Sequence, residues 1–238
     1  MAYRKSRRYQ QCLEKVPQGK VSVAEAVTAV KGMDGTKFDQ TVELSLSLGL
    51  NPRQAEQNLR GSVSLPHGIG KTRRVVAFCE GDDVEKARQA GAVEAGSDEL
   101  VEKIEGGWME FDVAVASPQV MKKISRLGRV LGPQGLMPSP KAGTVVDDVA
   151  TAVKEYSAGK VEYRTDAGGN IHVPVGKTSF EDQQLVDNVN AMLDMIRRLR
   201  PSTVKGTYMR RATLSATMTP SVDLDLTVRT DVGGSSDE

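Results

Sequence analysis

The segment Thr41-Val42-Glu43-Leu44-Ser45-Leu46-Ser47-Leu48-Gly49-Leu50 decides one half of the fold, because apolar and polar residues alternate along its whole length. Successive side chains of a β-strand point to opposite faces of its sheet. A strand with this alternation has one face in the core and a polar face in water, as is common in antiparallel sheets. We therefore expect residues 41–50 to form a half-buried strand.

Helix signals lie on both sides of this strand. Ser22-Val23-Ala24-Glu25 is a capping box, in which a side chain at each end bonds to the backbone at the other. Asn51-Pro52 predicts the start of a short helix that ends near Gly61. Much later in the chain, Ser179 is predicted to cap a long amphipathic helix that Pro201 ends.

The middle of the chain has a different pattern. Residues 75–79 and 111–116 are short continuous apolar runs, and helix-like segments follow them at 83–90 and 118–127. Apolar strands alternating with helices predict a parallel sheet covered on both faces. Residues 128–143 are rich in glycine and proline, so we expect an ordered loop there.

Half-buried strand patterns return after Gly159. Residues 161–164 and 171–173 flank Asp166-Ala167-Gly168-Gly169-Asn170, whose composition predicts a hairpin turn. Pro174 cannot donate a ladder hydrogen bond, so this strand is expected at a sheet edge. Two further alternating runs follow at 214–218 and 222–228.

Composition bounds the class of protein. The chain has 238 residues, of which 39% are hydrophobic and 26% charged, which is typical of globular proteins. No apolar run approaches the roughly 18 residues of a membrane span, so we expect no membrane partner. The only cysteines, Cys12 and Cys79, lie far apart, which fits a reducing cytoplasm and no disulfide framework. Neither they nor the two histidines have the spacing of a metal site.

Charge is unevenly distributed along the chain. Residues 1–66 carry 10 Lys/Arg and 6 Asp/Glu, residues 67–159 carry 12 and 14, and residues 160–228 carry 9 and 8. The outer segments are thus basic, +4 and +1, around a middle of −2. This profile is the one expected of a discontinuous domain interrupted by an acidic insert, although a single domain could also have it. The last ten residues carry 1 basic and 3 acidic groups, and we expect this tail, 229–238, to be disordered.

Motifs for catalysis or cofactor binding fail on inspection. Gly70-Lys71-Thr72 and Gly176-Lys177-Thr178 resemble the end of a phosphate-binding loop, but Leu65 and Ile171 stand where its other glycine is needed. The loop at 128–143 lacks the dinucleotide glycine spacing. We therefore expect no cofactor and no enzyme, with a nucleotide-binding enzyme on the central segment as the rival hypothesis. DNA binding is disfavoured because no basic recognition helix is evident.

The outer segments instead carry clusters of basic residues. Aromatic residues are only 4% of the chain, which argues against a base-stacking platform. Contacts to phosphates and ribose 2′-hydroxyl groups of folded RNA fit this composition better, although any one cluster could be an ordinary solvated surface. The clusters are Arg4, Lys5, Arg7 and Arg8; Arg197, Arg198, Arg200 and Lys205; and Arg210 and Arg211.

Four stretches resemble the family of bacterial large-subunit ribosomal protein number one. The similarity runs from about residue 3 to 228, with several long motifs in the right order. These motifs are Lys37-Phe38-Asp39-Gln40-Thr41-Val42-Glu43, the segment 61–71, the segment 127–144, and Thr217-Met218-Thr219-Pro220-Ser221.

The resemblance implies an α/β protein of two domains. Residues 1–66 and 160–228 would form a discontinuous α+β RNA-binding domain, and residues 67–159 an inserted Rossmann-like α/β domain. It also implies a cytoplasmic, ribosome-bound structural constituent of the large subunit. Its partners would be 23S rRNA in the mobile stalk, transfer RNA leaving the exit site, and the messenger of its own operon, whose translation it would repress.

Site residues follow from the same resemblance. Two of the implied contacts have an alternative: Phe38 and Met218 would shield polar bonds from water, but either side chain could instead pack in the core. The family usually has glycine where this chain has Thr219, so position 219 is left out of the binding set. The implied RNA-binding residues are Lys37, Phe38, Thr41, Glu43, Thr217 and Met218, with Arg164, His172 and Lys177 as candidates for phosphate contacts.

Overall fold

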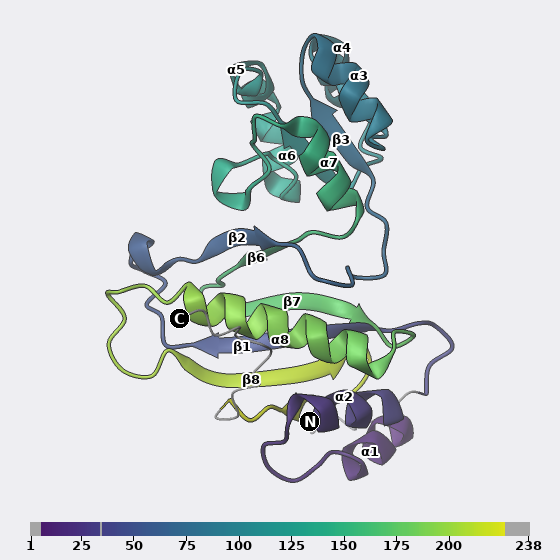
Figure 1. The fold of residues 1–238 in the computed structure, drawn as a ribbon, viewed down its shortest axis with the longest axis vertical. Helices are drawn as coiled ribbons and strands as arrows, with labels where there is room; N and C mark the ends of the chain where they lie inside the picture. The colour runs from purple at the N-terminus through teal and green to yellow at the C-terminus, as the bar shows by residue number, and fades with distance from the viewer. Residues whose placement is uncertain (1–5, 34, 227–238) are drawn as a thin grey trace, which may run out of the picture. The chain divides into compact units, whose positions relative to one another are not determined.

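The computed structural model describes residues 6–33 and 35–226, and its chain divides into two compact units. Unit 1 consists of Met1–Leu59, Leu65–Gly70 and Arg164–Glu238, and unit 2 of Arg60–Ser64 and Lys71–Tyr163. Unit 1 therefore joins segments from the two ends of the sequence (Figure 1). The expected tail at 229–238 lies outside the described residues. Among the described residues, no helix is both long enough and apolar enough to cross a membrane.

Unit 1 is built on a four-stranded antiparallel sheet in the order β7-β1-β8-β9. The central strand β1 (Thr41–Leu48) has four fully buried apolar side chains alternating with polar ones, so the predicted half-buried strand is confirmed. The other described elements of unit 1 are α1 (Arg7–Glu14), α2 (Val23–Gly32), η1 (Ala55–Gln57), β7 (Asn170–Lys177), α8 (Asp182–Arg198), β8 (Met209–Ala216) and β9 (Val222–Asp223).

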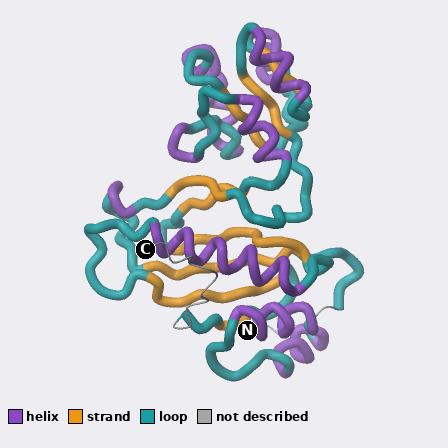
Figure 2. The backbone as a smooth tube through the Cα atoms, viewed as in Figure 1, coloured by secondary structure: helices purple, strands orange, loops and turns teal. Residues whose placement is uncertain are grey.

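Helices α2 and α8 cover the apolar face of this sheet. They pack against each other, α2 also contacts β8, and α8 contacts β7 (Figure 2). Their apolar stripes are buried, as the helical periodicity predicts. The capping box at Ser22 and Glu25 is present. The opposite face of the sheet, with the polar residues of each strand, stays open to solvent.

The expected edge position of Pro174 is confirmed, because Pro174 lies in β7, the outer strand of the sheet. The register shifts here: Glu43 pairs with Pro174 but Val42 pairs with Gly176, so Val175 is the extra residue of a β-bulge. Proline has no N–H for a ladder bond, and a bulge is a common solution at an edge strand.

Unit 2 contains a three-stranded parallel sheet in the order β4-β3-β5, and its two faces are both covered. Val76, Phe78 and Ala114 pack with α4 and the segment after β5, while Val75, Ala77 and other residues pack with α3 and α7. The predicted parallel sheet with two covered faces is thus confirmed. The elements are β3 (Val75–Phe78), α3 (Asp82–Gln89), β4 (Glu94–Gly96), α4 (Asp98–Glu105), β5 (Val113–Ala116), α5 (Met121–Ile124), η2 (Ser125–Leu127), α6 (Gly128–Gln134), η3 (Pro140–Ala142) and α7 (Val149–Ser157).

The predicted hairpin at 161–173 is wrong. Strand β6 (Val161–Arg164) pairs with β2 (Arg60–Val63) in a separate two-stranded sheet, whereas β7 pairs with β1. The turn between β6 and β7 does form locally, since Asp166 accepts bonds from the backbone of Gly168 and Asn170. The composition of residues 166–170 determines the local turn, but it does not determine which strand pairs with β6 or with β7.

Three local predictions also fail. The helix expected after Asn51-Pro52 is only the 3₁₀ turn η1, and β2 occupies the end of that range. Half of the expected loop at 128–143 is the helix α6, because Leu131 is fully buried in the core of unit 2. Helix α8 is capped by Glu181 and Gln184, whereas Ser179 bonds to Asp39 instead.

Candidate nucleic-acid interface

The open face of the unit 1 sheet is a grid of short polar side chains. Along β1 the solvent-side positions are Thr41, Glu43, Ser45 and Ser47, and strand register places further polar groups beside them. Glu43 lies opposite Ser215, and Ser45 lies opposite His172 on one side and Thr213 on the other. A surface rich in hydroxyl groups results, with His172 beside Ser45 and Arg211 beside Ser47.

Thr217, just after the end of β8, bonds to the backbone of Thr41 at one end of this face. Its hydroxyl accepts a hydrogen bond from the Thr41 backbone N–H at 3.2 Å and donates to the Thr41 carbonyl at 3.3 Å. The Thr217 N–H also donates to that carbonyl, at 3.1 Å. The ammonium group of Lys177, on the other neighbouring strand, donates to the Thr41 hydroxyl at 3.0 Å. Three chain segments therefore meet here around one residue, with one positive charge.

Two large apolar side chains stand exposed beside this end. Phe38 is 52% exposed and Met218 47% exposed, so the alternative that they pack in the core is wrong. The fully buried Gln40 ties their segments together, because its side-chain oxygen accepts from the Met218 backbone N–H at 2.8 Å. Gln40 also exchanges bonds with Thr178, through its own N–H and carbonyl. Two exposed apolar side chains at the same end of a polar sheet face can serve together as a contact surface.

Asp39 fixes the same segment from its other side. Its carboxylate accepts from the Thr178 hydroxyl at 2.9 Å, from the Ser179 hydroxyl at 2.8 Å and from the Ser179 backbone N–H at 3.1 Å. Desolvation raises the pKa of Asp39, but the bonds from Ser179 and Thr178 outweigh it, so that the pKa is lowered overall. Sequence reasoning missed both Gln40 and Asp39 as supports, because their partners lie some 140 positions away in the chain.

The remaining expected site residues divide into two groups. Lys37 and Glu43 are exposed and adjoin the Thr41 end, and His172 lies further along the same face, with its Nδ1 3.0 Å from the Ser45 hydroxyl oxygen. Arg164 is exposed, but it is the last residue of β6, which belongs to the separate two-stranded sheet with β2. The structure therefore brings all of the expected residues except Arg164 onto or beside one sheet face.

Thr219 stabilises its turn without needing a glycine. Its hydroxyl accepts from the Ala216 N–H at 2.9 Å, and its own N–H donates to the Ala216 carbonyl at 3.1 Å. No non-glycine residue in the described ranges has a positive φ, so Thr219 is free of the backbone strain that would favour glycine.

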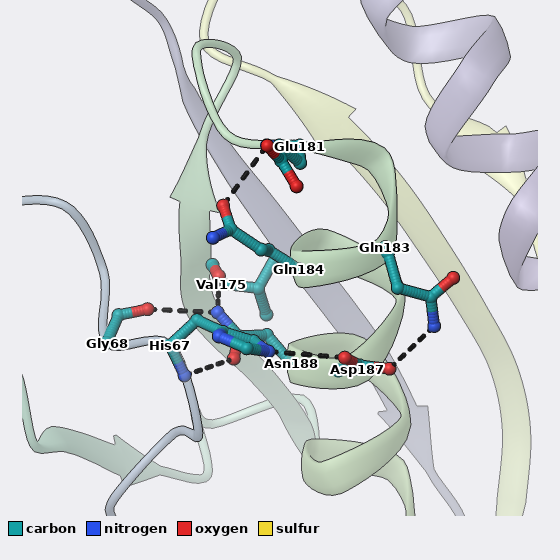
Figure 3. Close-up of polar contacts among 8 residues, drawn as sticks. All are labelled: His67, Gly68, Val175, Glu181, Gln183, Gln184, Asp187 and Asn188. Atoms are coloured by element: carbon teal, nitrogen blue, oxygen red, sulfur yellow. Dashed lines mark hydrogen bonds and ion pairs between the residues drawn. The ribbon is translucent and has the colours of Figure 1, made fainter.

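His67, which lies in the segment 61–71, has a structural role. Its backbone N–H donates to the side-chain oxygen of the fully buried Asn188, whose NH₂ group donates to the carbonyls of Gly68 and Val175 (Figure 3). The ring Nε2 lies 3.2 Å from an Asp187 oxygen. Within the described part of the chain, no hydroxyl or thiol bonds to the other ring nitrogen. The group therefore fixes residues 65–70 to α8 and β7 and lacks a nucleophile.

Unit 2 offers a poor phosphate site at its first strand-to-helix turn. Gly81 is the N-cap of α3 and offers no side chain to cap it, and Asp82, Asp83 and Glu85 occupy the first turn. Their negative charges repel an anion at the position where a helix would otherwise attract it. This arrangement disfavours the rival nucleotide-binding enzyme.

Comparison with known proteins gives one consistent result. The model of the ribosomal protein L1p/L10e family matches residues 28–220. Large ribosomal subunit protein uL1 of Limosilactobacillus reuteri is 49% identical over 228 residues, covering 95% of this chain and 99% of the relative. The uL1 proteins of Beutenbergia cavernae and Corynebacterium glutamicum are 54% and 48% identical, covering 84% and 92% of this chain and 84% and 94% of the relatives.

Proposed function

The chain belongs to the ribosomal protein L1p/L10e family, and on that basis we propose that it binds 23S rRNA through the open face of unit 1. Membership makes it a structural constituent of the large ribosomal subunit and not an enzyme. The proposal adds which surface of this chain holds the RNA and by what chemistry.

The arrangement around Thr41 is the single observation that carries this proposal. Hydroxyl and backbone groups of Thr41 and Thr217 converge there, beside the cation of Lys177 and the exposed Phe38 and Met218. Ribose 2′-hydroxyl groups both donate and accept, so a rigid set of hydroxyl and amide groups can distinguish RNA from DNA. The two apolar side chains would cover these bonds once RNA is bound and lower the local dielectric, which strengthens them.

Finer parts of the proposal rest on family resemblance. We infer that the bound RNA is part of the mobile stalk, that the protein contacts transfer RNA leaving the exit site, and that it represses its own operon by binding a similar fold in the messenger. The cytoplasm is the corresponding location. We further propose that residues 1–66 with 160–228 act as the RNA-binding domain and 67–159 as a separate insert. The division into units supports this, but it groups 60–64 and 160–163 with the insert and 67–70 with the other domain.

A binding experiment with the full chain tests the proposal. A helix-loop fragment of 23S rRNA should bind, with an affinity that falls with salt, and the DNA of the same sequence should bind far less tightly. Phe38→Ala removes an exposed side chain and should weaken RNA binding without changing thermal stability. Equal affinity for RNA and DNA, or an unchanged affinity in Phe38→Ala, would contradict the assignment of this surface.

Thr217→Val separates the hydroxyl from the shape of the side chain. Loss of the hydroxyl should cost roughly 1–3 kcal/mol of RNA-binding free energy, because partners are left unbonded in the interface. Thr217→Ser keeps the hydroxyl and is the matched control, with affinity close to that of the parent chain. Circular dichroism of both variants separates lost binding from lost folding.

A further inference from the structure

A shallow hollow lies further along the open face, away from the Thr41 end, and His172 is the expected site residue in its lining. It has a volume of about 180 Å³, and its lining includes Ser45, Ser47, Asn170, His172, Arg211 and Thr213. These residues come from the three adjacent strands β7, β1 and β8, all in unit 1. The volume is below the roughly 300–1,000 Å³ of a small-molecule pocket, so it suits one part of a larger ligand.

Several hydroxyl groups in this hollow are free to bond a ligand. The hydroxyls of Ser47, Thr213 and Ser221 have no hydrogen-bond partner within residues 6–33 and 35–226. Among the described residues, the Ser45 hydroxyl bonds only to the His172 ring. Each hydroxyl can donate once and accept twice, so together they offer both kinds of partner that a ribose needs.

At one side of the hollow, the planar guanidinium of Arg211 is held in place by Asp223, whose carboxylate balances its charge. Its guanidinium donates to Asp223 through Nε and one terminal nitrogen, at 2.8–3.0 Å, in a bidentate pair. The pair holds the guanidinium plane in one orientation, and such planes stack on nucleic-acid bases. Because Asp223 balances the charge, this region can recognise a sugar or a base but adds little general attraction for phosphate.

We propose that this hollow is a second RNA subsite, which receives the ribose and base of one nucleotide of the RNA held at the Thr41 end. This inference rests on the proposed function. Ser47 lies six residues from Thr41 along β1, and at a rise of roughly 3.3 Å per residue the two ends of the site are about 20 Å apart. Only a ligand of that length, such as a folded RNA strand, reaches both ends of the site. A free mononucleotide can therefore contact one subsite at a time and should bind more weakly.

The test uses the full chain with both subsites varied separately. Ser47→Ala with Thr213→Val removes two hydroxyl groups but keeps the shape of the face. Affinity for the 23S rRNA fragment should fall roughly 5-fold for one hydroxyl and roughly 30-fold for both. Thr28→Val, an exposed hydroxyl change on α2, is the matched control and should leave affinity unchanged.

Two further readouts distinguish a contact from a structural effect. Substitution of single RNA 2′-hydroxyls by hydrogen should reveal one nucleotide whose loss weakens the parent chain but not the double variant. The slope of log affinity against log salt should stay constant in the double variant, whereas Lys177→Gln should reduce it by about 1.

The outcomes separate the two proposals. If the parent chain fails to bind the RNA fragment, the proposed function and the subsite both fail. If it binds, and Phe38→Ala weakens it while the double variant matches the parent chain, the proposed function stands and the second subsite is refuted. A double variant that binds weakly to every RNA with no nucleotide-specific effect also refutes the subsite.

Discussion

Asn188 should be one of the most costly residues of unit 1 to truncate. Its side chain is fully buried and makes three hydrogen bonds to backbone groups, with His67 N–H and with the carbonyls of Gly68 and Val175. Asn188→Ala leaves all three without a partner. The Val175 carbonyl is buried, which costs roughly 1–3 kcal/mol, and the two partly exposed groups cost roughly 0.5–1.5 kcal/mol each. The sum is about 2–6 kcal/mol, against a total stability of roughly 5–15 kcal/mol for a typical domain.

Urea unfolding and amide hydrogen exchange measure this effect. Because the chain has two units, exchange of individual amides separates local from global opening better than a single transition does. The His67 amide should lose most of its protection in Asn188→Ala, and amides of β7 should follow. Asp187→Asn, which alters the exposed pair with the His67 ring and the exposed bond from the Gln183 side chain, is the matched control and should cost less than about 1 kcal/mol. A cost below about 1 kcal/mol for Asn188→Ala, with His67 protection retained, would refute the assignment of these bonds.

Two titrating groups give opposite pH predictions. Asp39 has a lowered pKa in the folded chain, so its contribution to folding stability is present above the unfolded pKa and is lost as pH falls through the folded pKa. Asp39→Asn should therefore reduce the acid dependence of stability. The change should be less than about 1 kcal/mol, because the group is exposed. Burial raises the pKa of Glu162, despite Arg60 and Arg73 nearby, so its ionised form weakens folding as pH rises. Glu162→Gln should be more stable than the parent chain at pH 7, and the difference in melting temperature should vanish at a pH below the unfolded pKa. Equal pH profiles of variant and parent chain would contradict either assignment.

Sequence reasoning succeeded where the pattern was local. The alternation along β1, the capping box at Ser22 and the edge position of Pro174 each depend on a few neighbouring residues, and each is confirmed. The parallel sheet of unit 2 was also predicted, because continuous apolar strands alternate there with helices.

Failures arose where distant residues decide the outcome. Composition around Asp166 indicated a turn and thereby a hairpin, but β7 gains its partner from β1, more than a hundred residues earlier. Ser179 has a good capping side chain, yet Asp39 binds it instead. Leu131 lies in a helix despite the nearby glycines and Pro133, since burial in the core outweighs the local preference.

The candidate site could be predicted only in part for the same reason. Family motifs placed Thr41 and Thr217 in one interface, but their mutual hydrogen bonds join positions 176 apart. Gln40 carries no sequence signal for its buried bridging role. The hollow beside Ser47 was not predicted, because it is formed by register between three strands and by no motif.

The position of β1 in its sheet has a consequence during synthesis of the chain. This strand is translated early, but both of its neighbours, β7 and β8, come from the last third of the sequence. A nascent chain therefore exposes the apolar face of β1 without partners until the ribosome has nearly finished, and a polypeptide that stops before Met209 lacks β8 and β9 on one side of it. If the open face binds RNA as we propose, a chain that stops before Met209 lacks β8 and should not bind it.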